Sequence, residues 1–154
     1  MNRTPWHLPF AMVISAFALA APALAAQPDW PPSVDALAIA ARKALPTVGM
    51  KEYRRVVDEP KDALLLDVRE PDEFAAGHVP GAINIPRGVL EFRIWKVMGY
   101  PGKVNLDRTI YVQCLTGGRA SLAARTLETL GFHHPVVVLM DFREWEKASN
   151  PVVK

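Results

Sequence analysis

Short apolar runs alternate with helix-like segments along most of this chain, and the alternation constrains the fold more than any other feature. The runs expected to form strands are 62–68, 81–86, 108–113 and 136–140. The segments after them are rich in helix-forming residues, and most end at a glycine: 70–77, 89–98, 120–130 and 142–148. Continuous apolar runs are typical of parallel strands covered on both faces. The sequence therefore predicts an α/β fold with a parallel central sheet and helices on both faces.

The N-terminal segment differs in composition from the rest of the chain. One basic residue, Arg3, precedes an apolar stretch at 8–21, and the small residues Ala23 and Ala25 fit the positions before a cleavage site. An uncleaved membrane anchor is the alternative, but prolines interrupt the stretch and its many alanines are only weakly apolar. We therefore expect 1–25 to be a signal peptide. The mature protein would then be periplasmic or secreted, without membrane contact after cleavage.

The length and charge of the chain limit its domain number and its partners. Its 154 residues suit a single domain. We expect an N-terminal linker and helix at 26–46, with Ser33 as the helix N-cap, followed by one domain at 47–150. The 18 Lys and Arg residues nearly balance the 16 Asp and Glu residues and are scattered, so nucleic acid is not expected as a partner.

The chain has one cysteine, Cys114, in the stretch QCLTGGRA. Exported domains normally use cysteines in pairs as disulfides, and a lone cysteine cannot cross-link its own chain. Cys114 lies between the expected strand at 108–113 and the expected helix at 120–130, which places it at the carboxyl edge of the sheet. Open α/β folds bind their ligands at this edge. A buried structural thiol, an intermolecular link and a reactive nucleophile all remain open at this point.

The residues after Cys114 favour the reactive thiol. Gly117 and Gly118 tolerate positive φ, so the loop can turn with its N–H groups directed at the sulfur. The N-terminus of the following helix adds its free N–H groups, and Arg119 adds a permanent charge or anchors the loop. A packed structural cysteine would need none of these features. We therefore predict that a Cys114 thiolate is stabilised in this loop and acts as a nucleophile.

Three segments carry a family resemblance: 64–74 (LLLDVREPDEF), 77–86 (GHVPGAINIP) and 114–119 (CLTGGR). In order and spacing they resemble the signature segments of the rhodanese-like domain. The resemblance implies a single domain with the α/β rhodanese fold, in which the catalytic Cys114 carries sulfur as a persulfide. It implies no metal and no other cofactor. It also implies that the transferred sulfur is bound by the rest of the loop, namely Leu115, Thr116, Gly117, Gly118 and Arg119.

The expected activity is that of a rhodanese-type sulfurtransferase, related to thiosulfate sulfurtransferases. Its partners would be a small sulfane-sulfur donor such as thiosulfate and a thiol or cyanide acceptor, with the sulfur passing through Cys114. Phosphatases with a similar cysteine loop place the arginine one residue farther along than Arg119, which favours sulfur over phosphoryl transfer here. The alternative is a non-catalytic sulfur carrier or protein-binding module of the cell envelope, with an envelope protein as its partner.

Several other residues are predicted to have structural roles. Asp67 and Arg69 are expected to form hydrogen bonds and ion pairs rather than to act in catalysis. We expect His78 in a fixed turn and the pair His133–His134 in a solvent-facing loop. Helical spacing favours core positions for the apolar residues Phe92, Trp95, Met98 and Tyr100.

The sequence departs from the family pattern before its last helix. Relatives commonly have two glycines where this chain has Asp141 and Phe142. These larger residues are expected to narrow or reshape the pocket.

Overall fold

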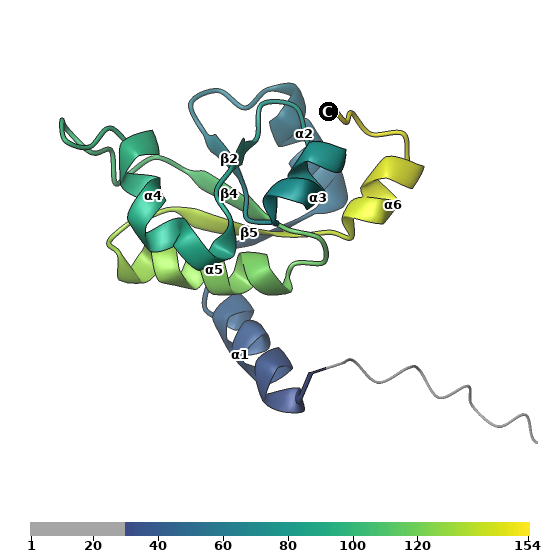
Figure 1. The fold of residues 1–154 in the computed structure, drawn as a ribbon, viewed down its shortest axis with the longest axis horizontal. Helices are drawn as coiled ribbons and strands as arrows, with labels where there is room; N and C mark the ends of the chain where they lie inside the picture. The colour runs from purple at the N-terminus through teal and green to yellow at the C-terminus, as the bar shows by residue number, and fades with distance from the viewer. Residues whose placement is uncertain (1–29) are drawn as a thin grey trace, which may run out of the picture.

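The structure, a computed structural model, describes residues 30–154 and contains a five-stranded, wholly parallel sheet. The strand order is β1-β5-β4-β2-β3, with helices on both faces of the sheet (Figure 1). The predicted α/β class is therefore confirmed. The predicted signal peptide, 1–25, lies outside the described residues.

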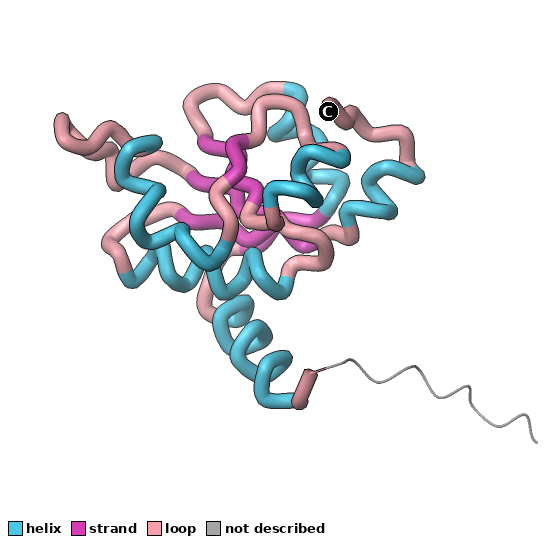
Figure 2. The backbone as a smooth tube through the Cα atoms, in the orientation of Figure 1, coloured by secondary structure: helices cyan, strands magenta, loops and turns pink. Residues whose placement is uncertain are grey.

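The strands at the centre of the fold are short (Figure 2). They are β1 (Thr47–Gly49), β2 (Leu64–Asp67), β3 (Ile83–Asn84), β4 (Ile110–Gln113) and β5 (Pro135–Leu139). The α-helices are α1 (Pro32–Lys43), α2 (Met50–Asp58), α3 (Pro71–Ala76), α4 (Leu90–Val97), α5 (Gly118–Thr129) and α6 (Phe142–Lys147), and a short 3-10 helix, η1 (Arg87–Val89), precedes α4. The four predicted strands and four predicted helices of the domain all occur. Strand β1 and helix α2 are additional.

Two hydrophobic clusters, one on each face of the sheet, form the core. Helices α4 and α5 cover one face, where Leu66, Ile94 and Leu127 are fully buried. Helices α2 and α6 cover the other, where Tyr53 and Trp145 are fully buried. All four residues of β2 are buried because this strand pairs with neighbours on both sides and is covered on both faces. This accounts for the continuous apolar run from which the strand was predicted.

Register brings the ends of β2 and β4 together at the carboxyl edge. Asp67, the last residue of β2, is paired with Gln113, the last residue of β4. Cys114 follows directly, so the position predicted for it at this edge is confirmed. The loop after β4 and the loop after β2 therefore lie next to each other, as open parallel sheets require.

Helix α1 packs against α5, on the side of α5 that faces away from the sheet (Figure 1). The prediction that Ser33 caps this helix is wrong. The helix begins at Pro32, and Pro31 occupies the N-cap position without a side-chain hydrogen bond. Proline suits this start because its fixed φ is already helical and its missing N–H would have no acceptor there. Within residues 30–154, no helix is both long enough and apolar enough to cross a membrane.

Two of the four apolar residues expected in the core lie on the surface instead. Phe92 is 84% exposed and Tyr100 is 63% exposed, whereas Met98 is buried and Trp95 packs against the core. Helix α4 has only one buried side, formed by Leu90 and Ile94. Phe92 lies between these two positions, about 200° around the helix from each, and therefore faces solvent.

Candidate active site

Cys114 is 2% exposed, and its sulfur faces the backbone of the following turn. The N–H groups of Gly117 and Ala120 both donate hydrogen bonds to Cys114 Sγ, at 3.2 and 3.4 Å. Helix α5, 12 residues long, begins at Gly118 and directs its N-terminus at the same sulfur. Two amide donors and the positive end of a helix stabilise negative charge on this atom.

Gly117 makes this turn possible. Its φ is +92°, in the left-handed region that favours glycine. A Cβ atom there would also lie 3.3 Å from Leu139 Cδ2, so both the backbone angle and the available space favour glycine. Gly118 does not use the positive φ that it tolerates, because this residue is the first of α5. The helix consequently starts two residues earlier than the predicted start at Ala120.

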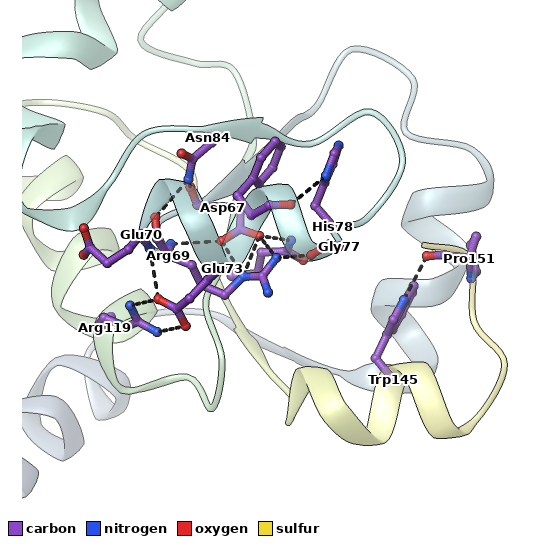
Figure 3. Close-up of polar contacts among 12 residues, drawn as sticks. Asp67, Arg69, Glu70, Glu73, Gly77, His78, Asn84, Arg119, Trp145 and Pro151 are labelled. Carbon is purple, nitrogen blue, oxygen red and sulfur yellow. Dashed lines mark hydrogen bonds and ion pairs between the residues drawn. The ribbon is translucent and has the colours of Figure 1, made fainter. Parts of the chain in front are cut away.

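Arg119 is joined to helix α3 by a two-pronged ion pair (Figure 3). Its guanidinium donates to both carboxylate oxygens of Glu73, at 2.6 and 2.8 Å. Glu73 also accepts a hydrogen bond from the N–H of Glu70, which closes a capping box at the start of α3. The hydrogen bonds from Arg119 lower the pKa of Glu73 to about 2, and the pair raises the pKa of Arg119. Of the two roles suggested for Arg119, the geometry favours loop anchoring.

A second pair, Arg69 with Asp67, is fully enclosed beside the loop (Figure 3). Arg69 donates two bonds to Asp67 Oδ2, at 2.7 and 2.9 Å, and a third to the carbonyl oxygen of Gly77 at 2.8 Å. Gln113 Nε2 donates to the same carboxylate at 3.0 Å. The predicted structural ion pair is therefore confirmed. It links β2, β4 and the end of α3 into one frame behind Cys114.

The segment that departs from the family pattern belongs to this frame. The centre of the Phe142 ring lies 4.0 Å from the Arg69 guanidinium carbon. The backbone N–H of Phe142 donates to the Leu115 carbonyl oxygen at 2.8 Å. Asp141 is the N-cap of α6 and accepts from the N–H of Arg143 at 2.9 Å. Neither side chain lines the cavity at Cys114. The expected narrowing of the pocket by these side chains is therefore wrong, because one packs against the Arg69 guanidinium and the other caps a helix. The alternative, that they reshape the pocket, stays a prediction.

The three histidines singled out in the sequence lie away from the sulfur. His78 stacks on Phe74, and its ring nitrogen Nδ1 lies 3.0 Å from the Phe74 carbonyl oxygen, as expected for a fixed turn (Figure 3). His133 is exposed and pairs with Asp107 at 2.7 Å, beside the exposed His134. The prediction of solvent-facing loop residues is confirmed for both members of that pair.

A cavity of about 400 Å³ opens at Cys114, between the loop and helix α1. Of the residues predicted to bind the sulfur, Leu115, Thr116, Gly118 and Arg119 line this cavity together with Cys114. Gly117 does not line it, but contacts Sγ through its N–H. Sequence reasoning did not find the opposite wall of the cavity. It consists of Trp30, which precedes α1, and of three residues of α1: Val34, Asp35 and Ala38.

Comparison with known families agrees with this geometry. Residues 50–148 match the Rhodanese-like domain, which covers most of the chain. The chain therefore belongs to the rhodanese-like domain family, a family of sulfur-transfer proteins, as the sequence resemblance implied.

Similar proteins are named as a sulfur carrier or as sulfurtransferases. The Bacillus subtilis protein "Putative sulfur carrier protein YrkF" is 31% identical over 102 residues, which are 66% of this chain and 51% of that protein. This chain thus spans about half the length of that relative. The human single-domain sulfurtransferase TSTD1 is 30% identical, with a TM-score of 0.56 and coverage of 66% and 96% of the two chains. The polysulfide-sulfur transferase homodimer of Wolinella succinogenes is 27% identical, with a TM-score of 0.64 and coverage of 79% and 87%.

Proposed function

We propose that this protein is a sulfurtransferase that moves sulfane sulfur from a donor such as thiosulfate to a thiol acceptor, or to cyanide, through a persulfide on Cys114. One observation carries the proposal. Cys114 lines a cavity, and its sulfur accepts hydrogen bonds from two backbone N–H groups, those of Gly117 and Ala120. The names of the relatives, a sulfur carrier and two sulfurtransferases, support the same chemistry.

The loop is suited to the first half-reaction. The Cys114 thiolate attacks the outer sulfur of thiosulfate, a new S–S bond forms, and the old S–S bond breaks with its electron pair leaving on sulfite. The product carries negative charge on the outer sulfur. Gly118 and Arg119 are the first two residues of α5, so their N–H groups have no acceptor within the helix. They are free to donate to that outer sulfur and to stabilise it.

The second half-reaction restores the enzyme. An acceptor thiolate, or cyanide, enters the same cavity and attacks the outer sulfur. The S–S bond to Cys114 then breaks, and the electron pair returns to Cys114 Sγ, where the amides of Gly117 and Ala120 again hold the thiolate. Donor and acceptor react in turn at one site, so the kinetics should be ping-pong.

Replacement of the nucleophile tests this proposal. Cys114→Ser should keep the fold, because the smaller hydroxyl can accept the same two amide hydrogen bonds. It should release no sulfite from thiosulfate, because a hydroxyl is a far weaker acid than a thiol and no second cysteine can replace it. Sulfite release and circular dichroism would be measured together. Undiminished release from the folded variant would overturn the mechanism, and loss of the folded spectrum would instead indicate a structural cysteine.

A sulfur carrier is the second candidate, favoured by the name of the Bacillus subtilis relative. A carrier would load Cys114 once and deliver the sulfur only to a protein partner, for example in the cell envelope. Sulfite release distinguishes the two functions. Many equivalents of sulfite per protein, in the presence of a small thiol, indicate an enzyme. A single equivalent that does not increase with added small thiol indicates a carrier.

The place of action is proposed from the sequence alone. Because the first 25 residues have the pattern of a cleavable signal, we propose export to the periplasm or beyond. N-terminal sequencing of protein from the cell envelope should find a chain that begins at Ala26 or one residue later. Recovery of an intact Met1 from the membrane fraction would contradict export by cleavage.

A further inference from the structure

We infer that the cavity at Cys114 selects sulfane-sulfur donors that carry an apolar organic group and little charge, and that helix α1 makes this selection. The inference deepens the proposed function and rests on it. It concerns the wall that the sequence did not reveal, which is formed by Trp30, Val34, Asp35 and Ala38. A donor must pass between this wall and the loop to bring its outer sulfur to Cys114.

Most of the side chains around this cavity are apolar. Val34 and Ala38, one helical turn apart on α1, lie on one side, together with Trp30 just before the helix. Leu115 and Leu122 lie on the loop side. Trp30 and Val34 remain 52% and 40% exposed, so this wall has apolar surface still in contact with water. An organic group bound against the wall would bury that surface, which is favourable, whereas a small oxyanion would not.

The charges at the cavity disfavour a dianion. Arg119 is the one cation among the lining residues that the structure describes, and both prongs of its guanidinium are occupied by Glu73. Asp35 adds a carboxylate on the α1 wall, where it accepts a hydrogen bond from Trp30 Nε1 at 3.0 Å. These three side chains together carry net negative charge. Thiosulfate would meet a paired cation and an opposing carboxylate.

Arg42, near the end of α1, is a second cation close to the loop, and it does not line the cavity. Its terminal nitrogen is 3.8 Å from the point where a Cβ of Gly117 would stand, on the side of that residue where Leu139 also lies. Arg42 therefore lies behind the turn rather than at the cavity. Its replacement gives a direct check on whether any free cation of α1 attracts the donor.

Three donors separate charge from apolar size while keeping the same reaction. Thiosulfate is a dianion, methanethiosulfonate is a small monoanion, and benzenethiosulfonate is a monoanion with an aromatic ring. In each case the Cys114 thiolate attacks the outer sulfur and one S–S bond replaces another. The electron pair leaves on sulfite or on the corresponding sulfinate, so atoms and charge balance without another reactant. The donors differ in intrinsic reactivity, and this difference cancels when each variant is compared with the parent protein.

The test measures kcat/KM for the three donors in the full chain and in four variants. In Trp30→Ala, the preference for benzenethiosulfonate over methanethiosulfonate should fall about tenfold, as for other losses of apolar contact in a pocket. In Asp35→Asn, which keeps an oxygen to accept from Trp30, kcat/KM for thiosulfate should rise about threefold relative to the monoanions. Leu37→Ala is the matched control, since Leu37 is on α1 and 64% exposed but outside the cavity, and it should change neither ratio. Arg42→Gln should not lower kcat/KM for thiosulfate relative to kcat/KM for the two monoanions.

The outcomes separate this inference from the proposed function. If no donor transfers sulfur to Cys114 in the parent protein, the proposed function fails and the inference fails with it. If sulfur is transferred but Trp30→Ala and Asp35→Asn leave both ratios unchanged, only the inference is overturned. A selective loss of thiosulfate turnover in Arg42→Gln would also overturn it, because a free cation would then bind the dianion.

Discussion

The two sides of the Cys114 loop are built from opposite kinds of contact. Towards β2 and α3, Arg69 and Arg119 are each held by a carboxylate through directional hydrogen bonds, several of them shorter than 3 Å. On the side that faces α1, the cavity wall offers mainly apolar side chains and one carboxylate, Asp35. Charged hydrogen bonds fix position and angle, whereas apolar contacts tolerate many shapes. The polar side therefore sets the geometry of the reacting sulfur, and the apolar side is free to determine what reaches it.

The polar side itself contains two unlike ion pairs. Arg69 and its partner Asp67 are 3% and 0% exposed, while Arg119 and its partner Glu73 are 33% and 29% exposed. Breaking a buried pair leaves an uncompensated charge without water, whereas a broken surface pair is resolvated. The first pair should therefore matter most for stability, and the second most for the position of the loop.

The largest effect on stability is expected for Arg69→Met. The change leaves the Asp67 carboxylate buried with only Gln113 as a side-chain donor, and removes the guanidinium from the Phe142 ring. The free energy of unfolding should fall by about 3–5 kcal/mol. Urea unfolding followed by circular dichroism measures it. Arg54→Met is the matched control, because Arg54 pairs with Asp58 on an exposed helix surface and should cost less than about 1 kcal/mol. Equal losses in the two variants would contradict the distinction.

A smaller and more local effect is expected for Arg119→Lys. Lysine keeps the charge but lacks the planar guanidinium that donates to both oxygens of Glu73. The start of α5 should therefore no longer be held at a fixed position relative to α3. Sulfur loading of Cys114 should slow about tenfold, while the free energy of unfolding changes by less than about 1 kcal/mol. Arg125→Lys, in an exposed pair with Glu128 on the same helix, is the control. Equal loading rates in parent and Arg119→Lys would remove Arg119 from the site.

The smallest effect is a pH dependence caused by Glu73. Its pKa is about 2 in the folded protein against 4.5 in an ordinary glutamate, so folding favours the charged form. The pair should stabilise the fold fully above the unfolded pKa and lose its contribution as the pH falls from about 4.5 towards about 2. Glu73→Gln should therefore cost about 1 kcal/mol near neutral pH. In urea unfolding, this cost should shrink steadily below about pH 4.5. A cost that is constant over this range would show that charge at Glu73 does not stabilise the fold.

The sequence predicted those parts of the fold that have strong local signals. The apolar runs of β2 and β5 and the glycine at the end of α5 were sufficient to locate these elements. Strand β1 was missed because it has three residues and only Val48 is buried. Helix α2 was missed because it is strongly polar, with Tyr53 as its one fully buried residue. Both elements depend on contacts with the assembled sheet: β1 pairs with β5, and α2 packs through Tyr53. Contacts between residues far apart in the sequence leave no local signal.

The candidate site divides in the same way. The loop from Cys114 to Arg119 is contiguous, so residue types alone predicted its amides and its helix N-terminus. The partner of Arg119 could not be predicted, since Glu73 reaches it from α3 across the sheet edge. The α1 wall could not be predicted either, because it depends on how α1 packs against α5. The spacing of Val34 and Ala38, one helical turn apart, indicates only that α1 has an apolar side and not what that side contacts.

The central claim, that Cys114 carries the transferred sulfur, is tested most directly by mass spectrometry of the protein after treatment with thiosulfate or benzenethiosulfonate. The peptide that contains Cys114 should gain the mass of one sulfur atom and lose it again on addition of a thiol or cyanide. Reversal is essential, because oxidation of the cysteine to a sulfinic acid adds nearly the same mass and is not undone by thiols. A Cys114 peptide that gains no sulfur from either donor, or keeps the added mass after thiol and cyanide, would contradict the account.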